Sequence, residues 1–143
     1  MRIITPVLIL LVIAISTSAC GGSDEVVLQD AWARPGFKGD NSAVYLTIMN
    51  PTDLRDGLIG ATSDVAAVTD IHLSRMDDTG TMTMERQDLI IIPPNGSAEL
   101  SPGGLHVMLV NLMKDLSVDD TFPITLEFQR AGDITIEVEV KQP

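Results

Sequence analysis

The sequence is short of cysteine and of basic residues, and each shortage excludes a class of structure or function. The single cysteine, Cys20, has no partner for an internal disulfide, so the folded part must be stabilised by a hydrophobic core. Nine lysine and arginine residues stand against 20 aspartate and glutamate residues, which gives a formal net charge of −11 at pH 7. A surface of this sign repels nucleic acid and anionic lipid headgroups, so we predict no nucleic-acid partner.

Histidine is equally scarce, and this limits the catalytic chemistry. Only His72 and His106 are present, and no Ser/His/Asp or Cys/His set is available for nucleophilic catalysis. The pair Gly103 and Gly104 lacks the Gly-x4-Gly-Lys-Ser/Thr frame of a phosphate-binding loop. A blue-copper electron carrier would need a cysteine thiolate among its metal ligands. We therefore expect a protein that is not an enzyme.

The first 20 residues predict export and a lipid anchor. Arg2 precedes an apolar run at residues 7–15 that is too short to span a bilayer comfortably, and small residues at 16–19 lead to Cys20. This arrangement resembles a bacterial lipoprotein signal, which is cut before the cysteine that then carries lipid. An ordinary secretory signal, cleaved close to Ala19, is the alternative. The lipoprotein interpretation predicts an extracytoplasmic, membrane-anchored protein on the periplasmic or cell-surface side.

The rest of the chain predicts one all-β domain. We expect residues 1–19 to be the signal peptide, residues 20–25 to be the lipidated cysteine and a flexible tether, and residues 26–143 to be a β-sandwich or small barrel. Short β-branched or alternating runs recur roughly every 8–12 residues between Gly, Pro and Asn turns, and no segment has a helical period. The expected strands cover residues 26–28, 30–35, 43–49, 58–62, 66–73, 81–85, 89–92, 97–100, 105–112, 124–128 and 134–140.

Both histidines belong to one pattern with two methionines, His72-x11-Met84-x21-His106-x-Met108. Imidazole and thioether donors without cysteine suit a soft ion such as Cu(I) better than Zn(II), Mg(II) or Ca(II). Residues two apart in a strand share a face, so we expect the side chains of His106 and Met108 to bind one ion together. We expect His72 at the end of its strand, Met84 beyond a loop at residues 74–80, and all three segments at one rim of the sandwich.

Two further methionines, Met76 and Met82, have an open role. Met82 shares strand parity with Met84 and would face the same side, whereas Met76 is expected in the loop beside His72. Each would serve as an auxiliary metal ligand or as part of a methionine-lined approach surface. The remaining methionines are interpreted as core packing or initiation, because methionine commonly fills cores.

The complete spacing resembles the motif of the periplasmic copper chaperones of the PCu(A)C family, His-(Met)-x10-Met-x21-His-x-Met. Leu73 stands at the bracketed methionine, a position that the family treats as variable. Four other segments also resemble the sequences of this family: residues 30–35, 43–45, 76–78 and 102–109.

The resemblance implies a cupredoxin-like Greek-key β-sandwich and a carrier of Cu(I) outside the cytoplasm. It implies that the carrier supplies the binuclear copper centre of cytochrome c oxidase, with oxidase subunit II or a thiol-based copper assembly factor as the recipient. Some members have a His- and Met-rich tail for Cu(II); residues 140–143 lack one, so Cu(II) handling is not expected. The implied ligands are His72, Met84, His106 and Met108. The rival interpretation is a non-metal adhesion or structural β-sandwich lipoprotein, with its histidines pointing into the core.

Overall fold

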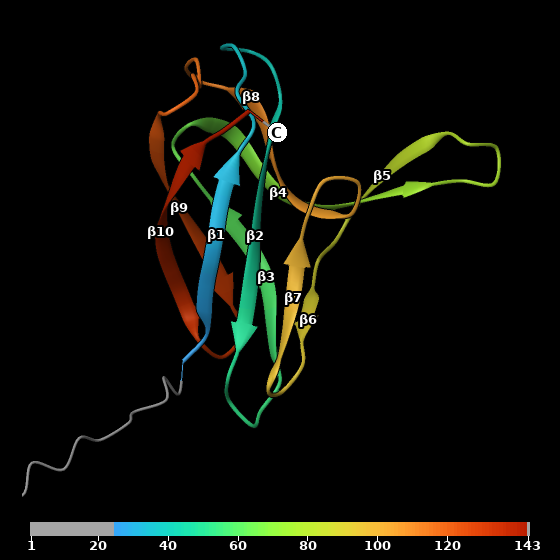
Figure 1. Cartoon of the computed structure of the whole chain (residues 1–143), viewed down its shortest axis with the longest axis vertical. Coiled ribbons are helices and arrows are strands. Elements are labelled where there is room, and N and C mark those ends of the chain that lie inside the picture. The colour runs from blue at the N-terminus through green and yellow to red at the C-terminus, as the bar shows by residue number, and fades with distance from the viewer. Residues whose placement is uncertain (1–24, 143) are drawn as a thin grey trace, which may run out of the picture.

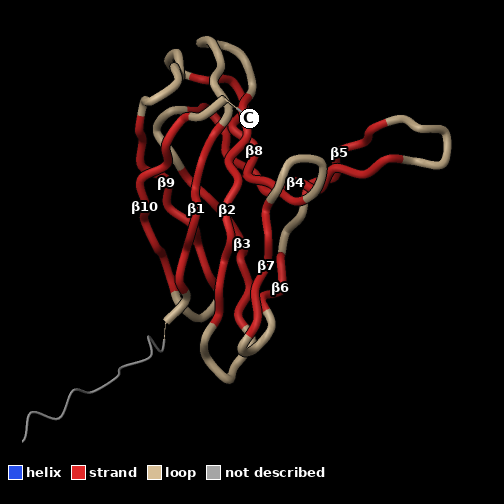
Figure 2. Tube along the Cα trace, in the orientation of Figure 1, coloured by secondary structure: helices blue, strands red, loops and turns tan. Residues whose placement is uncertain are grey.

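Every regular element of the computed structural model, which describes residues 25–142, is a β-strand (Figure 1, Figure 2). The strands are β1 (Val27–Ala33), β2 (Ser42–Asn50), β3 (Asp56–Thr62), β4 (Ala66–Met76), β5 (Met82–Arg86), β6 (Ile90–Ile92), β7 (Gly96–Leu100), β8 (Leu105–Leu112), β9 (Thr121–Phe128) and β10 (Gly132–Val140). The all-β prediction is confirmed. The predicted signal peptide at residues 1–19 and the predicted lipidation site Cys20 lie outside the described residues. Between residues 25 and 142, no helix is long and apolar enough to cross a bilayer.

The strands form one hydrogen-bonded sheet that folds over on itself as a sandwich. Along the sheet the order is β5-β4-β8-β2-β1-β10-β9-β3-β6, and β7 also pairs with β2. The pairing of β1 with β10 is parallel, whereas the pairings that build the region around β4 and β8 are antiparallel. Jumps in the order, such as the one from β8 to β2, are crossover connections of the kind that Greek-key sandwiches contain.

The hydrophobic core lies between the two halves of this strand order. Leu46 of β2 and Val107 and Leu109 of β8 are at most 2% exposed. Large buried side chains from the other half are Leu58, Phe122, Ile124, Leu126 and Val138. Because successive side chains of a strand point to opposite faces, the burial of Val107 and Leu109 turns His106 and Met108 toward the outer face of β8.

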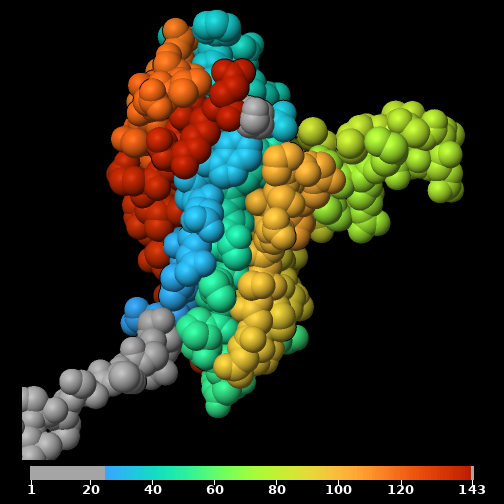
Figure 3. Space-filling view, viewed as in Figure 1, coloured from blue at the N-terminus to red at the C-terminus, as the bar shows by residue number. Residues whose placement is uncertain are grey.

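The β4–β5 hairpin projects from the body of the sandwich as an arm (Figure 1, Figure 3). The predicted loop at residues 74–80 began too early, because β4 continues to Met76 and pairs with β5 along its last five residues, which leaves residues 77–81 as the connection. The strands are joined by a short turn around Asp77, whose side chain accepts hydrogen bonds from the backbone N–H groups of Thr79 and Thr81 at 2.9 and 2.8 Å. An aspartate that bonds its own downstream backbone stabilises a tight turn, which lets the strands run longer than their composition predicts.

Candidate metal centre

Two histidines from neighbouring strands face each other on the side of the sheet that points away from the hydrophobic core. β4 and β8 are antiparallel, and their register pairs His72 directly with His106, so both side chains leave the same face of the sheet. The ring centroids are 5.9 Å apart and the ring planes are nearly perpendicular, at 73°. An ion that lies about 2.0–2.1 Å from an imidazole nitrogen is roughly 3 Å from the ring centre, so the observed separation suits one shared ion.

The turn before β8 holds the ring of His106. This residue is 3% exposed, and its Nδ1 lies 3.0 Å from the carbonyl oxygen of Gly104. Because a carbonyl only accepts, Nδ1 donates, and the lone pair of the neutral ring is on Nε2. The turn is closed by the backbone N–H of Gly104, which donates to the Ser101 carbonyl at 3.0 Å, and Gly103 adopts a left-handed φ of 83°. The backbone therefore orients His106 as it commonly does for metal-ligating histidines.

His72 contributes a buried nitrogen without a partner. Its Nδ1 has no hydrogen-bond partner among the described residues, although buried polar nitrogens are normally paired. Burial lowers the pKa of His72 below its usual value of 6.5; the positive charges of His106 and Arg86 also lower it, and the carboxylate of Asp70 raises it. The neutral ring that a metal requires is thus favoured, and a bound metal ion would satisfy the orphaned nitrogen.

Met108 and Met84 flank His72 on opposite sides. Met108 of β8 lies opposite Asp70 and is therefore a diagonal neighbour of His72. Met84 of β5 lies opposite Ser74 and is a diagonal neighbour of His72 on the other side. Diagonal neighbours in an antiparallel pair are about 7–8 Å apart, which long side chains can bridge. Met84 is 55% exposed, whereas Met108 is half-buried.

The four predicted residues thus occupy one face of three adjacent strands, β5, β4 and β8. The expectation of a strand end at His72 was wrong, because the hairpin extends β4 beyond it. Met76, expected in a loop, also belongs to β4 and lies directly opposite Met82. This second methionine pair is farther out along the same face of the hairpin.

Tyr45 and Trp32 form an aromatic wall beside the histidines that the sequence did not predict. The ring centroid of Tyr45 is 6.3 Å from that of His106 and 4.7 Å from that of Trp32. Tyr45 is buried, and the guanidinium of Arg34 lies 5.7 Å from the centre of its ring. The wall shields one side of His106 from water. Only the strand order β8-β2-β1 reveals it, because these aromatic residues are distant from both histidines in the sequence.

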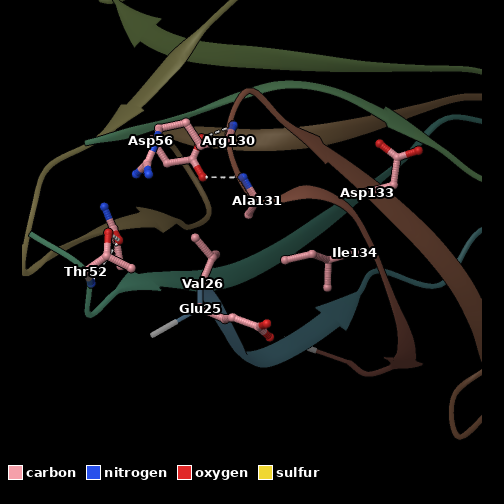
Figure 4. A pocket seen from close by; sticks show the side chains of 9 residues that line it. Glu25, Val26, Thr52, Asp56, Arg130, Ala131, Asp133 and Ile134 are labelled. Atoms are coloured by element: carbon pink, nitrogen blue, oxygen red, sulfur yellow. Dashed lines mark hydrogen bonds between the residues drawn. The ribbon is translucent and has the colours of Figure 1, made fainter. Parts of the chain in front are cut away.

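The pocket in Figure 4, with a volume of about 400 Å³, contains none of the predicted ligands. Its buried carboxylate, Asp56, accepts hydrogen bonds from the backbone N–H groups of Arg130 and Ala131, both at 2.9 Å, and so stabilises the β9–β10 turn. Within residues 25–142, no group of three or more His, Cys, Asp or Glu side chains is arranged to hold a metal ion. A site for a hard cation or a zinc-type site is therefore not found in this part of the chain.

The chain matches one protein family and resembles several solved copper-domain structures. Residues 26–140 match the family described as "Putative lipoprotein LpqE-like". The chain is 32% identical over 114 residues to "Uncharacterized protein RP573" of Rickettsia prowazekii. This aligned region covers 76% of this chain and 62% of the relative. The matched region thus spans less than two thirds of that relative.

Two solved structures share the architecture. The copper-bound PCuAC domain from PmoF2 is 29% identical with a TM-score of 0.69, over 83% of this chain and 94% of that domain. The Cu(I) form of DR1885 from Deinococcus radiodurans is 25% identical with a TM-score of 0.58, over 80% of this chain and 78% of that one. These likenesses confirm the predicted cupredoxin-like fold. The chain belongs to the LpqE-like lipoprotein family, a PCuAC-like family, as its histidine and methionine spacing predicted.

Proposed function

We propose that this protein is a lipid-anchored, extracytoplasmic Cu(I) chaperone that delivers one copper ion to the copper centre of cytochrome c oxidase. The proposed ligands are His72, Met84, His106 and Met108. The observation that carries the proposal is the cross-strand pair of His72 and His106, flanked on the same face by the two methionines. The likeness to a copper-bound PCuAC domain and to the Cu(I) form of DR1885 supports copper as the cargo.

The chemistry of the four donors favours Cu(I). Two imidazole nitrogens and two thioether sulfurs are neutral, and thioether sulfur prefers soft monovalent copper to harder divalent ions. Nε2 of His106 and the unpartnered Nδ1 of His72 are the nitrogen atoms available to bind copper. The complex keeps a single positive charge, so the ion is held without the charge pairing that thiolates would add.

The contrast in exposure between the ligands supports a carrier role. His106 is buried and fixed by backbone, whereas Met84 is exposed on the projecting arm. A sulfur or nitrogen ligand of a recipient can reach the ion from the side of Met84 and take its place. Transfer is then a ligand exchange, in which copper stays Cu(I) and no electron moves.

The family match supports the anchoring part of the proposal. Cys20 would carry the lipid, and residues 20–25 would connect it to β1. In Figure 1, β1 begins at the lower end of the sandwich, whereas the β4–β5 arm projects sideways from its upper half. A tether attached at that lower end leaves the arm free for the proposed recipient, oxidase subunit II or a thiol-based copper assembly factor.

Cu(I) titration of the full chain tests the ligand set. The protein in detergent and reductant competes with the chelator bathocuproine disulfonate, as wild type, as the double variant His106→Ala, Met108→Ala, and as the control Met113→Ala. Met113 is also exposed but lies just beyond β8. Loss of a residue that only hydrogen-bonds a metal ligand costs about 10- to 100-fold in metal affinity, so loss of two direct ligands should cost more than about 100-fold. Unchanged affinity in the double variant would show that the ligand assignment is wrong.

Copper transfer tests the proposed delivery. Cu(I)-loaded protein is mixed with the copper-free copper domain of oxidase subunit II, and the metal content of each is measured after separation. Delivery predicts that copper moves to the oxidase domain, and its retention on the chaperone contradicts that recipient. The rival adhesion or structural role predicts no stoichiometric Cu(I) binding by the wild type, and its inward-pointing histidines disagree with rings on the outer face of β4 and β8.

A further inference from the structure

The proposed copper site leaves unexplained the two methionines farther out on the β4–β5 arm. We propose, on the basis of that function, that Met76 and Met82 form a second, weaker Cu(I) site. This outer site shares Met84 with the inner set of His72, His106 and Met108. Copper passes through it on the way to and from the histidine pair.

The register of the hairpin brings the three thioethers together. Met76 lies directly opposite Met82, and Ser74 directly opposite Met84. Side chains directly opposite in an antiparallel pair have Cβ atoms about 4.5–5.5 Å apart, well within the reach of two methionines that share one ion. Met84 is two residues from Met82 on the same strand face. The three sulfurs therefore line one side of the arm, ending beside His72.

The exposure of these residues argues against a packing role. Met76 is 67% exposed and Met82 is 49% exposed, so neither fills a gap in the core as methionine usually does. The opposite face of the arm carries no methionine: its residues are Leu73, Arg75, Thr83 and Glu85. The methionines are thus confined to the one face that leads to the histidines.

The turn at the tip keeps the outer pair in register. Besides its two backbone contacts, the Asp77 carboxylate accepts a hydrogen bond from the Thr79 hydroxyl at 2.6 Å. The backbone N–H of Asp77 donates to the Thr81 carbonyl at 2.9 Å. These bonds close the hairpin immediately after Met76 and before Met82. An arm without a core of its own is thereby held in a defined shape where the two sulfurs meet.

The two sites differ in their donor atoms and therefore in their affinity for Cu(I). Three thioethers provide soft donors for Cu(I) but lack the imidazole nitrogens of the inner set, so the outer site binds more weakly. Copper can move between the sites while Met84 remains bound: Met76 and Met82 attach as His72, His106 and Met108 detach. The outer site exposes the ion at the tip of the arm, where a recipient can bind it.

The test replaces the outer sulfurs while preserving shape. The double variant Met76→Leu, Met82→Leu keeps apolar side chains of similar volume, and Met113→Leu is the matched control for loss of an exposed thioether elsewhere. Full-length protein in detergent and reductant is titrated with Cu(I) against bathocuproine disulfonate. Wild type and control should bind a tight equivalent, whose ligands include Met84, and a weaker equivalent held by Met76 and Met82. The double variant should lose only the weaker one and release the tight copper to the chelator several-fold more slowly.

Methionine-methyl NMR assigns the two equivalents in the wild type. The first should shift the methyl signals of Met84 and Met108, and the second those of Met76 and Met82. The inference is overturned if the double variant keeps the weaker equivalent, or if the second equivalent shifts other methionines instead. A wild type without a tight equivalent refutes the proposed function itself, whereas a tight equivalent with no outer binding refutes only the outer site.

Discussion

Arg86→Gln and Asp70→Asn should change the acid sensitivity of Cu(I) binding in opposite directions. Nη2 of Arg86 lies 3.5 Å from Oδ1 of Asp70, and this ion pair, exposed at the arginine and half-buried at the aspartate, borders His72. The arginine lowers the pKa of His72 and the carboxylate raises it. Removing the arginine also frees the carboxylate of Asp70, so Arg86→Gln should raise the pKa of His72. Asp70→Asn should lower it further.

The size of the effect follows from proton competition and Coulomb's law. A histidine with the ordinary pKa of about 6.5 would weaken a site that needs its neutral form by ~4-fold at pH 6.0 and ~30-fold at pH 5.0. Burial places the pKa of His72 below that value, so the wild type should lose less through this residue. If each charge is taken to lie about 7 Å away, as for neighbouring side chains on one sheet face, it contributes ~0.6 kcal/mol in a medium close to water, or ~0.4 pH units. The same energy acts on bound Cu(I), so at pH 7.5 Arg86→Gln should bind ~3-fold more tightly and Asp70→Asn ~3-fold more weakly.

The lowered pKa of His72 also fixes the sign of its effect on the stability of the copper-free protein. As the pH falls below 6.5, the unfolded chain takes up a proton on His72 before the folded chain does. The free energy of unfolding therefore falls from pH 6.5 down through the depressed pKa. Above pH 6.5 both states hold a neutral ring, and the contribution of His72 no longer depends on pH.

Chelator competition at pH 7.5, 6.0 and 5.0 measures the acid loss of affinity for wild type, Arg86→Gln and Asp70→Asn. Comparing the variants with the wild type cancels the contribution of the other ligands. NMR of the imidazole protons follows the titration of His72 in the copper-free protein. The reasoning is refuted if both substitutions change the decrease in Cu(I) affinity at low pH in the same direction, or if His72 of the wild type titrates at or above 6.5.

Three further substitutions have defined outcomes. Asp56→Ala leaves buried backbone N–H groups without an acceptor and should lower the free energy of unfolding by about 3 kcal/mol or more in urea denaturation, with a smaller loss for Asp56→Asn. Tyr45→Ala removes a buried aromatic ring and should cost about 3–5 kcal/mol in the same assay, whereas Tyr45→Phe should keep most of the stability. Asp77→Ala should speed amide hydrogen exchange at Thr79 and Thr81. In the wild type, the same loosening should appear only as the pH falls through the lowered pKa of Asp77, which the Thr79 hydroxyl depresses first and the backbone N–H groups further.

The pairing of His106 with Met108 on one strand face was predictable from the sequence, because side chains alternate along β8. The two-residue spacing alone placed His106 and Met108 on one face before any strand order was known, and the burial of Val107 and Leu109 agrees with that alternation. The turn at residues 102–104 was equally visible, because its glycines favour a left-handed backbone. Local signals of this kind depend only on neighbouring residues.

The partners across the strands were not predictable in the same way. The pairing of His72 with His106 depends on the register of β4 against β8, which 33 intervening residues leave open. Tyr45 reaches the site only because β2 lies beside β8 in the sheet. The length of β4 was underestimated because residues 74–76 show no strong strand composition. Their pairing depends on the turn at Asp77, which holds β5 against them.

The same hairpin links the stability of the fold to the release of copper. β4 and β8 are adjacent to the core, so His72, His106 and Met108 are supported by the most stable part of the sheet. β5 is exposed along its whole length and pairs with β4 alone, and strands with few buried apolar contacts open at the lowest free energy. Opening of the arm would withdraw Met84 while the other three ligands stay in place. Weakening the Asp77 turn should therefore speed the release of copper without changing the free energy of global unfolding, whereas a tighter turn should slow it.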